Sequence, residues 1–161
     1  MEAHTIVRGL RLKTLVLGLG NPILSDDSVG FRVAQALKGR FDEERVTVME
    51  TSLAGLSLLD LLLGYDRAII IDSTQTGGRV GEVYRLNAKD FDTTRHAASP
   101  HDVNLATALE LGKRLGLAVP KEIIIFAIEV QDVTTFSESL TPMVEQAIPQ
   151  VVEMVLEEMG S

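Results

Sequence analysis

Two aspartates and one histidine occupy positions where polar side chains gather in a parallel α/β sheet. Asp27 follows one apolar run, Asp72 ends another, and His101 stands at the start of an amphipathic stretch. The carboxyl ends of parallel strands meet at one edge of a sheet, together with the helix starts that follow them. Two carboxylates and an imidazole suit a borderline divalent metal. The sequence therefore predicts that Asp27, Asp72 and His101 form a metal-contacting site.

The same residues also have purely structural interpretations. Either member of the acidic pair at 26–27 would cap the next helix, because Asp accepts hydrogen bonds from the free N–H groups there. Asp72 would cap the turn after its strand. His101 would be a surface residue in the first turn of a helix, whose dipole keeps the ring neutral. His4 and His96 are predicted to be solvated.

The loop between the first strand and the first helix, GLGNPILSDDSVG at residues 18–30, is rich in glycine. Such a loop can bind a dinucleotide, but Ile23 stands where the third glycine of that fingerprint belongs. No Lys follows a Gly in the loop, so it is not a P-loop, and its two adjacent carboxylates would repel a phosphate. A nucleotide-binding α/β domain is therefore the weaker alternative.

Apolar runs alternate with amphipathic stretches along the chain, which predicts a mostly parallel sheet covered by helices on both faces. The run at Gly81–Leu86 alternates polar and apolar residues, which is typical of a half-exposed edge strand. The other predicted strands are Thr14–Gly18, Val46–Glu50, Arg67–Asp72 and Glu122–Ile128, and the predicted helices are Val29–Leu37, Leu53–Leu63, Ser99–Leu115 and residues 141 to about 158.

The start of the helix predicted at Ser99–Leu115 carries three signals. Ser99 is placed to act as the N-cap, Pro100 stands at the first helical position, and Asp102 follows three residues after Ser99. These signals predict that His101 lies in the first turn of that helix.

Composition excludes several classes of protein. The 161 residues fit one domain over 1–161, and 45% hydrophobic with 24% charged residues is typical of a globular chain. Without cysteine there is no disulfide scaffold, thiolate-bound metal or thiol nucleophile. A net charge of −8 and 4% aromatic residues argue against nucleic-acid binding. No apolar run approaches bilayer length and no signal peptide is evident, so a cytoplasmic protein is expected.

Several segments resemble the nickel–iron hydrogenase maturation endopeptidases, the family of processing proteases of the hydrogenase large subunit. The loop GLGNPILSDDSVG is similar to a family signature of the form G-x-G-N followed by an acidic pair and a Gly. The resemblance continues through TSLAGLSLLDLL, IIIDST, SPH and SESLTPMVEQAI, and so covers the chain from about Leu12 to the last helix.

The resemblance implies both a fold and a set of site residues. The fold is a three-layer α/β/α sandwich of the phosphorylase/hydrolase-like type, whose five-stranded sheet has the order 2-1-3-5-4 with strand 4 antiparallel. The metal-contacting and catalytic positions of the family fall on Asp27, Asp72 and His101. The first acidic position falls on Asp26, and a glycine typical of the family falls on Gly55.

The resemblance also implies a reaction. Members of the family remove a C-terminal peptide from a hydrogenase large-subunit precursor, and the nickel that they sense is carried by that substrate. We therefore expect a peptidase whose Asp27, Asp72 and His101 contact the nickel of the precursor, which positions the scissile bond. An alternative is a chaperone that checks the nickel without cutting. Without a metal, Asp27 and Asp72 would be a pair sharing a proton, as in aspartyl-type peptidases.

Overall fold

A five-stranded sheet with the strand order β2-β1-β3-β5-β4 forms the centre of the molecule. The computed structural model describes residues 12–88, 90, 94–96 and 103–160. Four strands are parallel and β4 pairs antiparallel with β5, as predicted for the edge strand. The strands are β1 (Thr14–Leu19), β2 (Val46–Thr51), β3 (Arg67–Thr74), β4 (Val83–Asn87) and β5 (Glu122–Glu129).

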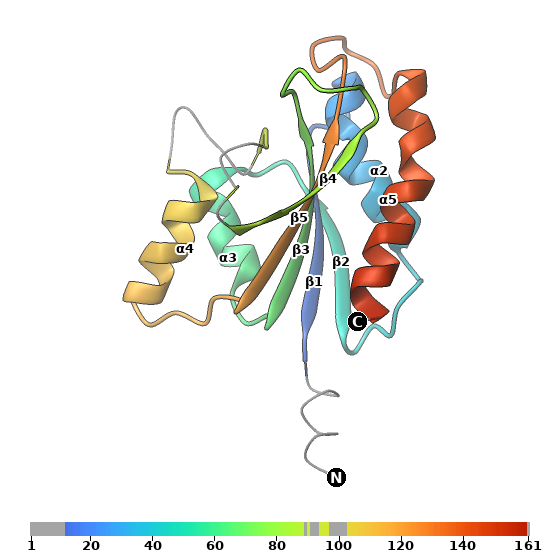
Figure 1. The fold of residues 1–161 in the computed structure, drawn as a ribbon. Helices are drawn as coiled ribbons and strands as arrows, with labels where there is room; N and C mark the ends of the chain where they lie inside the picture. Colours follow the sequence, from blue (N-terminus) through green and yellow to red (C-terminus); the bar gives the residue numbers. More distant parts are fainter. Residues whose placement is uncertain (1–11, 89, 91–93, 97–102, 161) are drawn as a thin grey trace.

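Helices cover both faces of this sheet, which confirms the three-layer arrangement (Figure 1). The helix α2 (Val29–Leu37) and the long helix α5 (Pro142–Gly160) pack on one face. The short helix α3 (Leu59–Leu62) and α4 (Leu105–Arg114) pack on the other. Two 3-10 turns, η1 (Ser25–Ser28) and η2 (Gly55–Leu58), lead directly into α2 and α3.

The two faces have separate apolar cores because successive residues of each strand point to opposite sides. Along β3, Ile69 and Ile71 pack toward α2 and α5, whereas Ala68 and Ile70 pack toward α3 and α4. All four side chains are fully buried. This explains the continuous apolar runs that predicted parallel strands. Among the helices that the structure describes, none is both long and apolar enough to cross a bilayer.

Two predicted helices are shorter in the structure. The stretch predicted as one helix at Leu53–Leu63 is the 3-10 turn η2 followed by a single turn of α-helix in α3. The helix predicted at Ser99–Leu115 begins at Leu105, and its N-cap is Asn104, whose side chain accepts a hydrogen bond from the Thr107 N–H at 3.0 Å. Ser99, Pro100 and Asp102, the three predicted start signals, lie outside the described residues.

Two glycines of the loop at 18–30 allow α2 to lie against the sheet. A Cβ on Gly18 would collide with the carbonyl group of Gly30, and a Cβ on Gly30 would collide with the carbonyl oxygens of Leu19 and Ile71. The first turn of α2 therefore touches the backbone of both β1 and β3. The glycine pattern that suggested a phosphate loop reflects this close packing of helix and sheet.

Candidate active site

The candidate site lies at the carboxyl edge of the sheet, where three segments meet. Asp27 comes from η1, Asp72 comes from the end of β3, and Arg95 and His96 come from the described segment 94–96 between β4 and α4. Asp27 and Asp72 are 2% and 0% exposed, so both carboxylates are buried. The structure thus brings the two predicted aspartates together.

The imidazole of His96 joins the two carboxylates. Its Nδ1 atom lies 2.7 Å from Oδ1 of Asp72, and its Nε2 atom lies 3.2 Å from Oδ2 of Asp27. The His96 side chain is 15% exposed. The prediction that His96 is solvated is therefore wrong. We call this arrangement, Asp27–His96–Asp72, the imidazole bridge.

Further contacts to the two carboxylates come from neighbouring segments of the same chain. Oδ1 of Asp27 accepts hydrogen bonds from the hydroxyl of Ser73 at 3.0 Å and from Nε of Arg95 at 2.9 Å. Asp72 accepts hydrogen bonds from the backbone N–H of Ser73 at 2.8 Å and from the backbone N–H of His96 at 2.6 Å. The contact with Ser73 is one that the structural interpretation of Asp72 expected, but Ser73 still belongs to β3, so Asp72 binds the end of its own strand and the segment 94–96 rather than a turn.

The segment that carries His96 is tied down through its backbone. The N–H of Arg95 donates to the carbonyl oxygen of Ser73 at 3.0 Å, and the carbonyl oxygen of His96 accepts from the N–H of Gly55 at 3.1 Å. Gly55 is the first residue of η2 and has a φ of 56°, a conformation that favours glycine. This is the glycine that the family resemblance singled out.

The charges of the site shift two pKa values in opposite directions. Burial alone would lower the pKa of His96, but the hydrogen bonds and charges of Asp27 and Asp72 outweigh it and raise the pKa to about 10. Burial alone would raise the pKa of Asp27, but hydrogen bonds and charges from His96 and Arg95 hold it below its ordinary value of 3.8. At neutral pH the bridge therefore consists of an imidazolium beside an ionised Asp27.

Asp26, the neighbour of Asp27, has a different task. Its fully buried carboxylate accepts hydrogen bonds from the backbone N–H groups of Gln131 at 3.0 Å, Asp132 at 2.9 Å and Thr141 at 2.7 Å. The hydroxyl of Thr141 adds a fourth at 2.7 Å. The prediction that the acidic pair caps α2 is wrong, because Asp26 instead holds both ends of the loop between β5 and α5.

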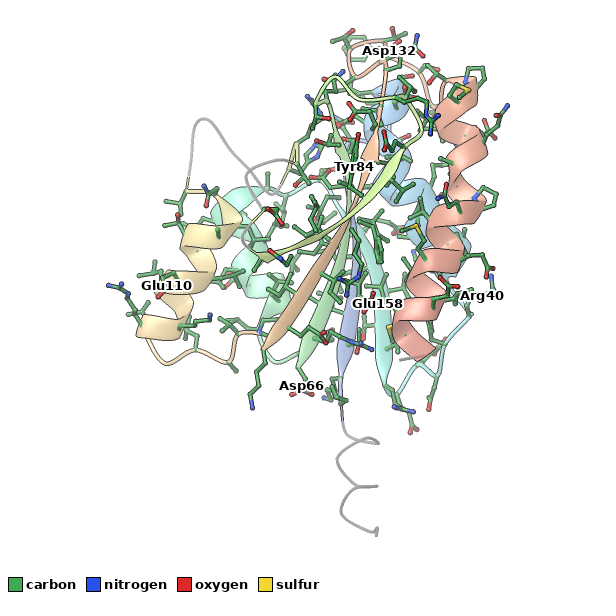
Figure 2. The ribbon with its side chains drawn as sticks, viewed as in Figure 1. Arg40, Asp66, Tyr84, Glu110, Asp132 and Glu158 are labelled. Atoms are coloured by element: carbon green, nitrogen blue, oxygen red, sulfur yellow. The ribbon has the colours of Figure 1, made fainter. Side chains whose placement is uncertain are left out.

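This loop at 131–141 stands at the same end of the molecule as the site. Figure 2 labels Asp132 in the loop and Asp66 at the opposite end of the sheet. The loop pairs with the turn before η1, since Ser25 N–H donates to the carbonyl oxygen of Ser137 at 2.8 Å and Ser137 N–H donates to that of Ile23 at 2.9 Å. The loop and the turn that carries Asp27 are therefore fixed to each other.

A fourth buried carboxylate orders the turn between β3 and β4. Glu129, at the end of β5, is 2% exposed and accepts hydrogen bonds from the backbone N–H of Thr76 at 2.8 Å and from the hydroxyl of Tyr84 at 2.9 Å. Burial opposes ionisation of Glu129, yet these hydrogen bonds hold its pKa below the ordinary value. Sequence reasoning did not find this residue.

His101, the third predicted site residue, lies outside the described residues. Its role as a metal-contacting and catalytic residue stays a prediction, as do those roles of Asp27 and Asp72. Within the part of the chain that the structure describes, no three His, Asp or Glu side chains are arranged to hold a metal ion. The carboxylates of Asp27 and Asp72 face His96 and Arg95 instead, so this conformation does not fit a metal ion between them.

Comparison with known proteins decides which family the chain belongs to. The family model described as hydrogenase maturation protease matches residues 31–158, which is most of the chain. The chain belongs to the hydrogenase maturation protease family. This confirms the predicted family, and it makes the chain a member of a family of peptidases. The matched residues include Asp72 and His96 and begin after Asp27.

Individual relatives align with about nine tenths of the chain. This chain is 28% identical to hydrogenase 2 maturation protease of Escherichia coli over 148 residues. The alignment covers 90% of this chain and 89% of the relative. The chain is 26% identical to the expression/formation protein HupD of Thiocapsa roseopersicina, over 89% of this chain and 66% of that protein.

A solved structure of the same family has the same fold. The hydrogenase maturating endopeptidase HybD from E. coli superposes with a TM-score of 0.77 and 28% identity, covering 92% of each chain. The predicted strand order, with β4 antiparallel, is therefore the architecture that this hydrogenase maturation protease shares with its solved relative.

Proposed function

We propose that this protein is an endopeptidase that removes a C-terminal peptide from a nickel-loaded large-subunit precursor of a nickel–iron hydrogenase. We also propose that the protein acts in the cytoplasm. The observation that supports it best is the convergence of Asp27 and Asp72 at the carboxyl edge of the sheet in a member of the hydrogenase maturation protease family. Ligands of open α/β sheets bind at that edge.

The proposal gives separate roles to the residues of the site. Asp27 and Asp72 contact the nickel centre of the docked precursor, and His101 is the third contact that the family resemblance implies. Asp27 is ready for this role because His96 and Arg95 keep it ionised at neutral pH. Ionised carboxylates and imidazoles are suitable donors for nickel.

The nickel in this proposal belongs to the substrate. In the described conformation, His96 contacts both Asp27 and Asp72, and Arg95 contacts Asp27. No metal is assigned to the enzyme itself. The arrangement differs from a proton-sharing aspartyl pair, because the two carboxylates here share an imidazole.

The decisive experiment is incubation of the purified protein with a purified, nickel-loaded large-subunit precursor. Mass spectrometry should detect a shortened large subunit and a released C-terminal peptide, in amounts that increase with time. A parallel sample without the protein controls for spontaneous cleavage. A stable complex without shortening would instead favour the non-cleaving chaperone, and neither binding nor cleavage would contradict both.

A further inference from the structure

Arg95 lies beside Asp27 with most of its hydrogen-bond donors unused. A guanidinium carries five N–H groups in one plane, and one of them, at Nε, donates to Oδ1 of Asp27 at 2.9 Å. Among the described residues, none accepts a hydrogen bond from its two terminal nitrogens. The Arg95 side chain is 35% exposed, so these nitrogens are open to a molecule that enters from solvent.

The other groups that contact the two aspartates have no donors to spare. The hydroxyl of Ser73 uses its one proton on Oδ1 of Asp27 at 3.0 Å. Both ring nitrogens of His96 face carboxylate oxygens, Nδ1 toward Asp72 and Nε2 toward Asp27. The backbone N–H groups of Ser73 and His96 donate to Asp72. Among the described residues in contact with the two aspartates, Arg95 is therefore the donor that a substrate can reach.

Two contacts fix the position of this guanidinium before any substrate binds. The backbone N–H of Arg95 donates to the carbonyl oxygen of Ser73 at 3.0 Å, and the Nε atom of Arg95 is held by the buried carboxylate of Asp27. Donors that are already oriented stabilise a developing charge without reorganising during the reaction. Arg95 also lies at the carboxyl edge of the sheet, where ligands of open α/β sheets bind.

We infer that Arg95 is a catalytic residue, which donates a hydrogen bond to the carbonyl oxygen of the scissile peptide bond. This inference rests on the proposed function. When water adds to the carbonyl carbon, an electron pair of the C=O bond moves onto that oxygen, and the guanidinium stabilises the negative charge. The pair then re-forms the C=O bond as the C–N bond breaks, and one proton of the water passes to the leaving nitrogen. Arg95 keeps its own protons throughout.

Cleavage kinetics with the purified, nickel-loaded precursor test the inference. Arg95→Gln should lower kcat by roughly a hundredfold and change KM by less than about threefold, because the lost interaction forms in the transition state. Arg95→Lys keeps the positive charge beside Asp27, and circular dichroism checks that both variants fold. Its kcat should still fall by about tenfold or more, since a single ammonium does not replace the planar fork of donors.

Ser73→Ala separates a direct role of Arg95 from one that acts through Asp27. It removes the other hydrogen bond to Oδ1 of Asp27 but takes no donor away from the substrate, so kcat should fall by less than about tenfold. Arg32→Gln is the matched control, because the Arg32 side chain is also 35% exposed and contacts Glu138 and Glu145 instead. It should retain the kcat of the wild type.

Two results would overturn the inference while the wild type still cleaves the precursor. Equal losses of kcat in Ser73→Ala and Arg95→Gln would mean that Arg95 acts only by holding Asp27. A kcat equal to that of the wild type in either Arg95 variant would mean that the guanidinium does not touch the reacting oxygen. A wild type that does not cleave would contradict the proposed function itself, and the inference with it, so the two failures are distinguishable.

Discussion

Asp72 combines a structural and a chemical task in one side chain. Its carboxylate orders the backbone of Ser73 and His96, and it also holds one end of the imidazole bridge. The two tasks depend on different properties, since the first needs hydrogen-bond acceptors and the second needs a negative charge. A substitution that keeps the shape and removes the charge separates them.

Asp72→Asn should therefore abolish cleavage of the precursor while the protein still folds. The NH2 group of the amide would replace one carboxylate oxygen and face a backbone N–H donor, so one hydrogen bond would be lost. This loss should cost about 2 kcal/mol of stability. Activity is measured by mass spectrometry and stability by urea unfolding. The exposed Asp66, at the other end of β3, offers Asp66→Asn as a control that should remain active. A fully active Asp72→Asn protein would exclude a metal-contacting carboxylate at this position.

The raised pKa of His96 predicts how stability depends on pH. Its pKa rises from 6.5 to about 10 on folding, so the contribution of the bridge is complete below 6.5 and disappears as the pH rises through about 10. The lowered pKa of Asp27 matters at acidic pH. The stability that its ionised carboxylate contributes is lost as the pH falls below the ordinary pKa of 3.8.

Urea unfolding of wild type and His96→Gln across this range measures the bridge directly. Near pH 7 the wild type should be more stable by about 2 kcal/mol, and the difference should shrink both above pH 10 and below pH 4. Titrations elsewhere in the chain cancel because they affect both proteins. A difference that does not change between pH 7 and 10.5 would contradict an imidazolium between the carboxylates.

At the scale of secondary-structure elements, the position of the loop at 131–141 depends on one carboxylate. Asp26 accepts hydrogen bonds from backbone N–H groups at both ends of this loop, and Thr141 directly precedes α5. Asp26→Asn should cost about 2 kcal/mol and speed hydrogen exchange at Gln131, Asp132 and Thr141. The exposed Asp60 of α3 provides a control in Asp60→Asn. Unchanged exchange in Asp26→Asn would show that the loop is held by other contacts.

The contact between α2 and the sheet depends on the absence of one side chain. Gly30→Ala would place a methyl group against the carbonyl oxygens of Leu19 and Ile71, so about 3 kcal/mol of stability should be lost. At Gly160 an added Cβ would meet nothing within 4 Å beyond the local backbone, so Gly160→Ala should change stability by less than about 1 kcal/mol. Thermal unfolding compares the two. Equal melting temperatures would contradict the close packing of α2 on β1 and β3.

The elements that sequence predicted well are those whose burial is decided by their own residues. β1 and β3 are apolar on both faces, and α2 carries Val33 and Leu37 on one stripe, so periodicity located them closely. The start of α4 was misplaced because Asn104, which caps it, competes with equally suitable cap signals upstream. Asp26 was misread as a helix cap because its true partners lie about 105 to 115 residues away in the chain.

The complete site was harder to predict than the fold. Asp27 and Asp72 follow strands, so topology brings them to one edge. His96 lies in a polar segment without periodicity, and nothing local marks its side chain as buried. Charge compensation was the available signal, since two buried carboxylates need cations and Arg95 with His96 stands in the segment just before the predicted helix.

At the scale of the whole molecule, two proteins must meet for the proposed reaction. Cleavage should require nickel in the precursor rather than metal added to the enzyme. A difference of about 3 kcal/mol in binding is enough to prefer the loaded precursor by roughly a hundredfold. A gel time course with metal-stripped enzyme compares loaded and empty precursors, and equal rates of cleavage would contradict metal sensing.

The adjacency of Asp26 and Asp27 limits how this chemistry could be transplanted into another protein. One peptide unit joins the carboxylate that anchors the loop at 131–141 to the carboxylate that faces His96. A designer who grafted only Asp27, Asp72 and His96 onto a different α/β scaffold would leave the turn that aims Asp27 without its anchor. The smallest portable unit also includes Asp26, the position without a side chain at Gly30, and the loop at 131–141, which comes from a distant part of the chain.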